Sequence, residues 1–238
     1  MLPSLPNINS LSIILPCYKP GIDWQATVIN SINKLTDINL TELIIVNDGM
    51  STFSANGISE FLEISIPVKI ISNTVNMGKG YALRKGVNAA QGALIIYTDI
   101  DFPYTEESFR NIYAELLKGA DVAIGVRNKD YYTHLPKARI YISKLLRYVI
   151  RTFLRIPTDD TQCGLKGFNQ NGKKVFLETT IDRYLFDLEF IFLSARKKLK
   201  LQTVEVELRP EIVLSKMNWK VLMQEFGNFL KIFAKSIL

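Results

Sequence analysis

Ala93-Leu94-Ile95-Ile96-Tyr97-Thr98-Asp99-Ile100-Asp101 is a short apolar run that ends in two aspartates. Such a run predicts a buried central strand of a parallel sheet. The aspartates then leave the sheet at the carboxyl end of the strand, where open α/β sheets bind ligands. Carboxylate oxygens suit Mg²⁺ or Mn²⁺, and Mg²⁺ is commonly held by one or two carboxylates together with substrate phosphates. We interpret Asp99 and Asp101 as metal ligands, with helix capping next to Thr105-Glu106-Glu107 as the alternative.

Strands and helices alternate on both sides of this stretch. Strands are predicted over residues 11–15, 43–46, 68–71, 94–97, 122–125 and 202–208. Helices are predicted over residues 23–35, 58–64, 79–90, 106–118, 173–177 and 186–197, and amphipathic helices over 137–155 and 219–238. A glycine-rich segment over 161–172 has no predicted strand. The alternation predicts a single Rossmann-like α/β domain, with a mostly parallel sheet flanked by helices.

Composition limits the protein class. The chain has 238 residues, of which 47% are hydrophobic, so it can bury a substantial core. Its two cysteines, Cys17 and Cys163, are too few for a disulfide scaffold and indicate a reducing compartment. Neither a secretory signal pattern nor an apolar run of about 18 residues is present in the sequence. These features predict a cytoplasmic protein that does not span a membrane.

The positive charge is concentrated in one segment. Six basic residues and no acidic residue lie between His134 and Pro157, whereas the whole chain has a formal charge of +6. Four of them recur on one face of the helix predicted over 137–155, which indicates either a solvated face or attraction to an anionic membrane or phosphate. The apolar stripe of the helix over 219–238 fits membrane docking, core packing or a homodimer contact. We expect peripheral association with the cytoplasmic membrane face, a homodimer or membrane-protein partner as further options, and no nucleic acid.

Other candidate ligand-binding residues follow the predicted strands. Tyr18, within Pro16-Cys17-Tyr18-Lys19-Pro20, could pack against a flat ring, and Asp48 could accept a hydrogen bond from a nucleobase or a ribose. Each is also ordinary turn chemistry. Asn76-Met77-Gly78-Lys79-Gly80-Tyr81-Ala82 is a glycine-rich helix start of the type that binds anions on backbone N–H groups. It lacks the third glycine of a dinucleotide fingerprint and the Lys-Ser/Thr ending of a Walker loop.

The order of these strand ends resembles the GT-A fold of family 2 glycosyltransferases over about the first 130 residues. A more specific match is Asp160-Thr161-Gln162-Cys163-Gly164-Leu165-Lys166-Gly167-Phe168. This stretch resembles the signature Asp-Thr-Gln-Cys-Gly-Phe-Lys-x-Phe of dolichyl-phosphate glucosyltransferases and related polyprenyl-phosphate hexosyltransferases. Gly125-Val126-Arg127 is similar to Gly-Ser-Arg of that family, and Ser215-Lys216-Met217 to its Ser-Lys segment. Together the matches span nearly the whole chain.

The resemblance implies a nucleotide site in the first part of the chain. Pro16, Tyr18 and Asp48 would contact the nucleotide, and Lys79 would lie near it. Asn47 departs from the family pattern, in which an aspartate is frequent at this place. The segment after Pro16 departs as well, because the usual Asn-Glu after the tyrosine is Lys-Pro here. Any role of that Asn or Glu is therefore not transferred.

The resemblance also implies the phosphate-binding residues. Asp99 and Asp101 would hold Mg²⁺ or Mn²⁺ on the donor diphosphate. Arg127, with Arg139 and Lys216, would engage phosphates of the donor or the acceptor. Their positive charge would offset the negative charge that develops on a departing nucleoside diphosphate.

The choice of acceptor decides whether a general base is needed. A lipid phosphate arrives ionised, and it needs Arg and Lys to reduce repulsion between phosphates. A hydroxyl acceptor would need a carboxylate base, for which Asp160 and Asp187 are candidates. Asp101, Asp160 and Arg127 are therefore the predicted catalytic residues. His134 is the one histidine, so neither a His-dependent triad nor a zinc site is expected.

These observations favour a metal-dependent inverting glycosyltransferase that moves a hexose from a nucleotide sugar to a polyprenyl phosphate. Pro103 stands where mannose synthases often have a metal-binding glutamine, which favours a UDP-sugar. Residues 1–130 would bind the nucleotide sugar, and residues 131–238, with the amphipathic helices, would bind the acceptor. One alternative is a family 2 glycosyltransferase with a glycan or other hydroxyl acceptor in cell-surface polysaccharide synthesis. Another is a non-catalytic nucleotide-sugar-binding protein or a nucleotidyltransferase.

Overall fold

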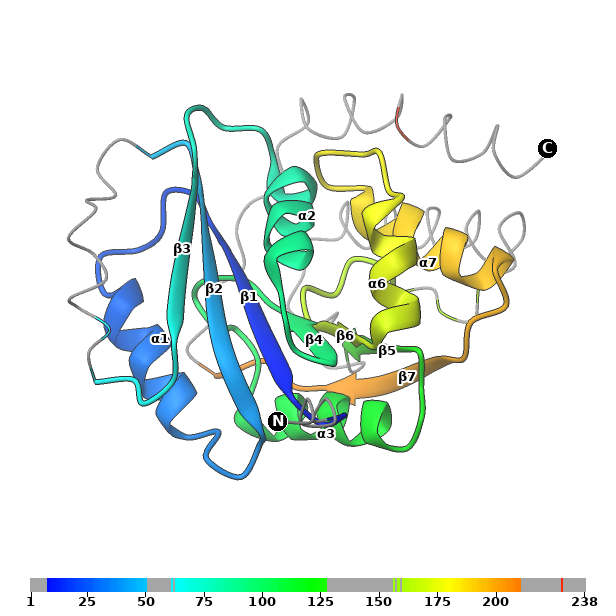
Figure 1. The fold of residues 1–238 in the computed structure, drawn as a ribbon, viewed down its shortest axis with the longest axis horizontal. Coiled ribbons are helices and arrows are strands. Elements are labelled where there is room, and N and C mark those ends of the chain that lie inside the picture. The colour runs from blue at the N-terminus through cyan, green and yellow to red at the C-terminus, as the bar shows by residue number, and fades with distance from the viewer. Residues whose placement is uncertain are drawn as a thin grey trace, which may run out of the picture.

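The computed structural model describes residues 8–50, 61, 63–127, 156, 158, 160–210 and 228. They form a seven-stranded sheet with the order β3-β2-β1-β4-β6-β5-β7 (Figure 1). The strands are β1 Leu11–Cys17, β2 Leu40–Asp48, β3 Val68–Asn73, β4 Leu94–Tyr97, β5 Val122–Arg127, β6 Lys166–Phe168 and β7 Leu201–Val206. The helices are α1 Trp24–Asn33, α2 Lys79–Ala89, α3 Glu106–Leu117, α6 Gln170–Leu177 and α7 Phe186–Arg196. The prediction of a mostly parallel sheet flanked by helices is confirmed.

β6 is the strand that the sequence did not indicate. It is inserted between β4 and β5 and runs antiparallel to both. Gly167 at its centre lies under α3, where a Cβ would come within 2.8 Å of the side chains of Ile112 and Leu116. A three-residue segment with a lysine and a glycine lacks the β-branched pattern of a strand, so the glycine-rich segment over 161–172 was given no strand in the sequence analysis.

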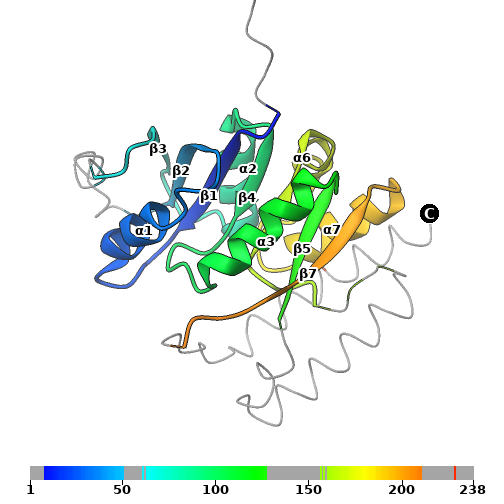
Figure 2. The ribbon, with the colours of Figure 1, turned by 90° about the horizontal axis from the view of Figure 1, so that it is seen from below.

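Both faces of the sheet are buried. Alternating side chains of β1 enter two hydrophobic layers: Ile13 and Leu15 pack with residues of α1 and α3, whereas Ile14 packs with residues of α2, α6 and α7. Figures 1 and 2 show these two groups of helices on opposite sides of the sheet. Because the faces are covered, ligands have access to the sheet at its strand ends.

Most predicted elements lie within a few residues of the observed ones. Of the helix predicted over 58–64, the structure describes residues 61, 63 and 64: the first is 3₁₀-helical, the other two form a turn and a bend, and none is in an α-helix. The helices predicted over 137–155 and 219–238 lie outside the described residues, apart from Asn228. Among the residues that are described, no helix is long and apolar enough to cross a membrane.

The strand ends gather the candidate residues at one edge. β1 pairs in parallel with both β2 and β4, so the carboxyl ends of these strands lie together. α3 follows β4, and its N-cap is Thr105, whose Oγ1 accepts a hydrogen bond from the Ser108 N–H at 3.3 Å. Because Thr105 caps the helix, Asp99 and Asp101 remain available for a ligand.

Candidate active site

The carboxyl ends of β1, β2, β4 and β5 open into a cleft of about 670 Å³, which residues 183–187 border on another side. The cleft is lined by these candidate residues: Pro16, Tyr18, Asp48, Lys79, Asp99, Asp101, Arg127 and Asp187. Asp160 is buried and bonds to Arg127. Arg139, Lys216 and His134 lie outside the described residues. The structure therefore brings most of the predicted site together.

Lys79 links α2 to the aspartate pair after β4. Its Nζ lies 2.5 Å from Asp99 Oδ1. Burial alone would lower the pKa of Lys79, but the nearby carboxylates of Asp99, Asp187 and Asp101 raise it, so the ammonium stays charged. Desolvation in the cleft and repulsion by Asp99 raise the pKa of Asp101. The aspartate pair is thus a negative site that one lysine neutralises in part.

A left-handed turn supports the aspartate pair. Phe102 has a φ of 44°, and its N–H donates to the Asp99 carbonyl at 3.0 Å. This conformation is unusual for a bulky residue and must be held by its surroundings. The Phe102 ring is buried and stacks on Phe109, with centroids 5.3 Å apart. The hydrophobic core therefore fixes the backbone that carries Asp99 and Asp101.

The aspartate pair fits a divalent metal that is shared with a diphosphate. The Asp99 side chain is 39% exposed, and Asp101 is exposed as well. The part of the chain that the structure describes has no group of three or more His, Cys, Asp or Glu that could hold a metal ion. Mg²⁺ is commonly held by one or two carboxylates together with substrate phosphates and water, which is an arrangement that this pair fits. Metal binding by Asp99 and Asp101 stays a prediction.

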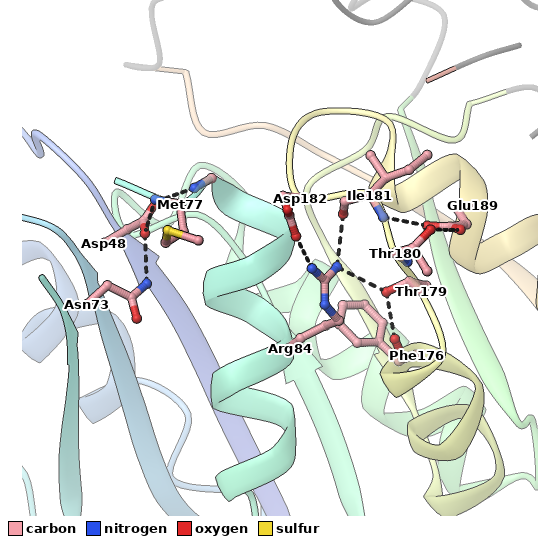
Figure 3. Close-up of polar contacts among 11 residues, drawn as sticks. Asp48, Asn73, Met77, Arg84, Phe176, Thr179, Thr180, Ile181, Asp182 and Glu189 are labelled. Carbon is pink, nitrogen blue, oxygen red and sulfur yellow. Dashed lines mark hydrogen bonds and ion pairs between the residues drawn. The ribbon is translucent and has the colours of Figure 1, made fainter. Parts of the chain in front are cut away.

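Asp48 binds the segment that follows β3. Its Oδ1 accepts from the Asn73 side chain at 2.8 Å and the Met77 N–H at 2.9 Å (Figure 3). Its Oδ2 accepts from the Asn76 side chain and the Gly78 N–H, each at 2.8 Å. These bonds occupy the acceptor positions of a carboxylate, so Asp48 shapes the loop next to the cleft. Direct contact of Asp48 with a nucleotide stays a prediction.

The glycine-rich start of α2 is bonded to the protein itself. The Met77 and Gly78 amides donate to Asp48, and the Gly80 and Tyr81 amides donate to the Asp182 carbonyl at 2.7 and 3.3 Å. The expectation that backbone N–H groups of this segment bind an anion was wrong for these four amides, because each already has an acceptor. The positive group that α2 presents near the aspartate pair is the Lys79 side chain.

The signature segment packs directly against the aspartate pair. A Cβ on Gly164 would lie 2.5 Å from Asp99 Oδ2, so a larger residue here would push this carboxylate aside. The Gly164 N–H donates to the Tyr104 hydroxyl at 2.9 Å, and Cys163 Sγ lies 3.3 Å from the same oxygen. Burial raises the pKa of both Tyr104 and Cys163, so these groups are neutral supports of the loop.

Arg127 and Asp160 form a forked ion pair at the end of β5. Arg127 Nη2 lies 2.5 Å from Asp160 Oδ1, and Arg127 Nε donates to Oδ2 at 3.0 Å. The Arg127 backbone N–H also donates to Oδ2, at 2.8 Å. The Asp160 side chain is 3% exposed, and the pair is desolvated on that side. Asp160 therefore holds Arg127 at the cleft wall.

Lys166 and Asp187 form a second ion pair beneath the cleft. Lys166 is fully buried, and its Nζ donates to Asp187 Oδ1 at 2.8 Å and to the Cys163 carbonyl. The Tyr97 hydroxyl donates to the same Asp187 oxygen, and burial raises its pKa well above the usual range. Asp187 is therefore fixed by a cation and a neutral phenol from two other strands.

Comparison with known proteins decides the family. Residues 12–176 match the family model described as glycosyl transferase family 2. The chain belongs to glycosyl transferase family 2. It is 30% identical over 237 residues to a dolichyl-phosphate beta-glucosyltransferase of Trichomonas vaginalis, covering 93% of this chain and 72% of that protein. A dolichyl-phosphate beta-glucosyltransferase of Saccharomyces cerevisiae is 26% identical over 234 residues, covering 85% of this chain and 70% of that protein.

Solved structures give the same fold. Glucosyl-3-phosphoglycerate synthase from Mycobacterium tuberculosis in complex with UDP has a TM-score of 0.69 and 16% identity, covering 96% of this chain and 80% of that chain. The complex of that enzyme with Mn²⁺, UDP and glucosyl-3-phosphoglycerate has a TM-score of 0.62, the same identity of 16% and the same coverage of 96% and 80%. Identity this low indicates the fold alone, which is the predicted GT-A fold. The protein is a glycosyltransferase, and the non-catalytic and nucleotidyltransferase alternatives were wrong.

This family 2 glycosyltransferase also has cleft residues that the sequence did not single out. Arg183 and Tyr184 line the cleft from the segment between α6 and α7, and Tyr104 lines it from the segment before α3. No local motif marks Arg183 or Tyr184, because their position depends on how their loop docks on α2. Pro16 and Tyr18 also line the cleft, and Tyr18 is 46% exposed, but their contact with a nucleotide stays a prediction.

Replacing Gly164 with alanine should lower the affinity for Mn²⁺ with UDP by about tenfold, because the new Cβ would displace Asp99. Gly21→Ala is a matched control, because Gly21 also lines the cleft but has open space around its Cβ position. Calorimetric titration of both variants would measure the effect. An affinity of Gly164→Ala equal to that of Gly21→Ala would contradict the role given to Gly164.

Proposed function

We propose that this glycosyltransferase moves a hexose, with inversion, from a UDP-sugar to a polyprenyl phosphate. The observation that carries the proposal is that both candidate general bases are already paired with a cation. Asp160 is held by Arg127, and Asp187 is held by Lys166 and Tyr97. A hydroxyl acceptor needs a carboxylate that can take a proton, whereas a phosphate acceptor is ionised and needs cations. The site therefore suits a phosphate acceptor better.

The names of the relatives support this choice. The two proteins compared above are dolichyl-phosphate beta-glucosyltransferases. A third such protein, from Dictyostelium discoideum, is 24% identical over 213 residues. The chain spans 72%, 65% and 72% of the length of the first three curated relatives. Family membership alone therefore does not assign the activity of these longer proteins to this chain. The substrate class is part of the proposal.

Asp99 and Asp101 would hold the divalent metal, which when bound offsets charge on the donor diphosphate. Mn²⁺ and UDP-glucose in a structure of the mycobacterial enzyme with a TM-score of 0.65 support this assignment. Lys79, beside Asp99, would place a further positive charge on the leaving group. Pro16 and Tyr18 would bind the nucleotide from the end of β1, and Asp48 would hold the adjoining loop in shape.

On the acceptor side, Arg127 would reduce repulsion between the incoming phosphate and the donor diphosphate. Asp160 would orient its guanidinium through the forked ion pair. Arg139 and Lys216 would add positive charge from residues 131–238. Attraction of the basic segment near Arg139 to an anionic membrane would bring the protein to its lipid acceptor at the cytoplasmic membrane face.

The proposal is tested by incubating the protein with Mn²⁺, radiolabelled UDP-glucose and a short polyprenyl phosphate. We expect an organic-extractable, mild-acid-labile labelled product, and none when a chelator is present. GDP-mannose should replace UDP-glucose poorly. A product that forms equally well with chelator would contradict the metal role, and failure of a panel of UDP-sugars and GDP-sugars with this acceptor would contradict the function.

A further inference from the structure

The loop over residues 179–185 joins α6 to α7 and brings two exposed side chains to the cleft. Arg183 and Tyr184 are exposed and line the cleft. The residues before them are bonded to α2 and α7 by a set of polar contacts (Figure 3). Because a surface loop is normally the least constrained part of a fold, this anchoring needs a reason.

Arg84 of α2 provides the first anchor. Its Nη1 donates to the Ile181 carbonyl at 2.9 Å and lies 3.4 Å from the Thr179 hydroxyl. Its Nη2 is paired with the Asp182 carboxylate. The Arg84 side chain is 17% exposed, so these contacts are partly shielded from water. One guanidinium thus binds three positions of the loop.

Glu189 of α7 provides the second anchor. Its carboxylate accepts from the Thr180 and Ile181 amides, each at 2.8 Å, and from the Thr180 hydroxyl at 2.9 Å. Glu189 is 1% exposed. The loop also touches the start of α2 closely, since a Cβ on Gly80 would lie 2.5 Å from the Ile181 carbonyl. The loop therefore has one defined position on α2.

Arg183 follows directly after these anchored residues. A Cβ on Gly78 would lie 3.1 Å from Arg183 Cγ, so the arginine stem lies next to the residue that precedes Lys79. Two other cations of the cleft have carboxylate partners, Lys79 with Asp99 and Arg127 with Asp160, whereas Lys19 lies over the Tyr18 ring. Within the described residues, Arg183 makes no salt bridge. Its guanidinium is available for an anionic ligand.

We infer that Arg183 binds a phosphate group of a substrate, and that Arg84 is the positioning residue that holds the Arg183 loop. This inference rests on the proposed function, because it takes the ligand of the cleft to carry phosphate. A planar guanidinium suits phosphate because it donates two parallel hydrogen bonds. The phosphate belongs either to the donor diphosphate or to the acceptor, and the two sources are distinguished by separate titrations.

The donor titration compares UDP with uridine in the presence of Mn²⁺, using wild type, Arg183→Gln and the control Lys174→Gln. Lys174 is exposed on α6 and does not line the cleft. If Arg183 binds the donor, Arg183→Gln should lower the affinity for UDP about tenfold and leave the affinity for uridine unchanged. This is the effect expected when a hydrogen bond to a charged group is lost. If it binds the acceptor, UDP affinity stays constant and the KM for a short polyprenyl phosphate rises about tenfold.

The role of Arg84 is tested by a double-mutant cycle, measured on whichever constant Arg183→Gln changes: the affinity for UDP or the KM for the polyprenyl phosphate. Arg84→Met alone should weaken phosphate binding about as much as Arg183→Gln. The double variant should lose no more affinity than the single variant with the larger loss. If Arg84→Met fails to fold, Asp182→Asn removes the same ion pair and keeps the carbonyl that accepts from Gly80. Additive losses would mean that Arg84 affects binding independently of Arg183, and no loss for Arg84→Met would mean that it contributes to stability alone; either result would overturn its positioning role.

The inference about Arg183 is overturned if Arg183→Gln matches Lys174→Gln in both titrations, or if uridine is weakened as much as UDP. If the wild type nevertheless binds UDP and transfers the sugar to a polyprenyl phosphate, the proposed function still stands. If wild type binds neither substrate, the proposed function and this inference fail together.

Discussion

Asp101→Asn should weaken the Mn²⁺-dependent binding of UDP by about a hundredfold or more, and turnover should fall with it. Even residues that only support metal ligands change metal affinity by about 10- to 100-fold, and Asp101 is proposed as a ligand itself. Asparagine keeps the shape of the side chain and removes the charge, while the buried ring of Phe102 continues to hold the turn. Calorimetry with UDP, with and without chelator, is the measurement.

Asp23→Asn is the control for this substitution, because Asp23 is exposed and lies outside the cleft. It should bind UDP as wild type does. Asp101→Asn should also melt at nearly the wild-type temperature, since Asp101 is exposed. UDP affinity that is the same with metal and with chelator in the wild type would contradict a metal held by Asp99 and Asp101.

Lys166→Met should lower the free energy of unfolding by about 3 kcal/mol, because it leaves the Asp187 carboxylate buried without its cation. For a chain of 238 residues this corresponds to a fall in Tm of roughly 6–12 °C. Lys166→Met combined with Asp187→Asn should recover most of the loss, since the uncompensated charge is gone and the amide oxygen still accepts from Tyr97. Thermal and denaturant unfolding would measure both variants.

Lys197→Met is the matched control, because Lys197 pairs with Glu178 at 2.5 Å but both side chains are nearly half exposed. An exposed pair contributes at most about 1 kcal/mol, so this variant should be close to wild type. Equal destabilisation of Lys166→Met and Lys197→Met would contradict the description of Lys166 as a buried counter-ion.

The sheet could be predicted from the sequence because its parallel strands are continuous apolar runs. β4 and its two aspartates were placed correctly, and so were the ends of β1 and β2 at the same edge. β6 could not be predicted, because its pairing depends on Gly167 fitting under α3 rather than on strand propensity. The local sequence pattern thus predicts the parallel strands, whereas the antiparallel strand β6 depends on tertiary contacts.

The residue types of the site could be predicted better than their partners. Sequence reasoning brought Asp99, Asp101, Lys79 and Arg127 to one cleft, as the structure has them. It treated Asp160 and Asp187 as available carboxylates, whereas each is bonded to a cation from a distant part of the chain. Such pairing depends on contacts between elements, so no spacing along the chain reveals it.

The position of Arg183 at the cleft could not be predicted from the sequence either. Its position follows from the contacts of Arg84 and Glu189 with residues 179–182, and these residues have no motif that marks them. The glycines at positions 78 and 80 were noted as an anion-binding pattern, yet their amides bind Asp48 and Asp182. The glycines instead permit the close approach of the loop over residues 179–185.

The central claim is that the acceptor is a phosphate and needs no general base. It is tested most directly by offering the protein, with Mn²⁺ and radiolabelled UDP-glucose, two acceptors of equal chain length, a polyprenyl phosphate and the corresponding polyprenol. The account predicts labelled, mild-acid-labile product from the phosphate and none from the alcohol. Transfer to the polyprenol, with none to the polyprenyl phosphate, would contradict it.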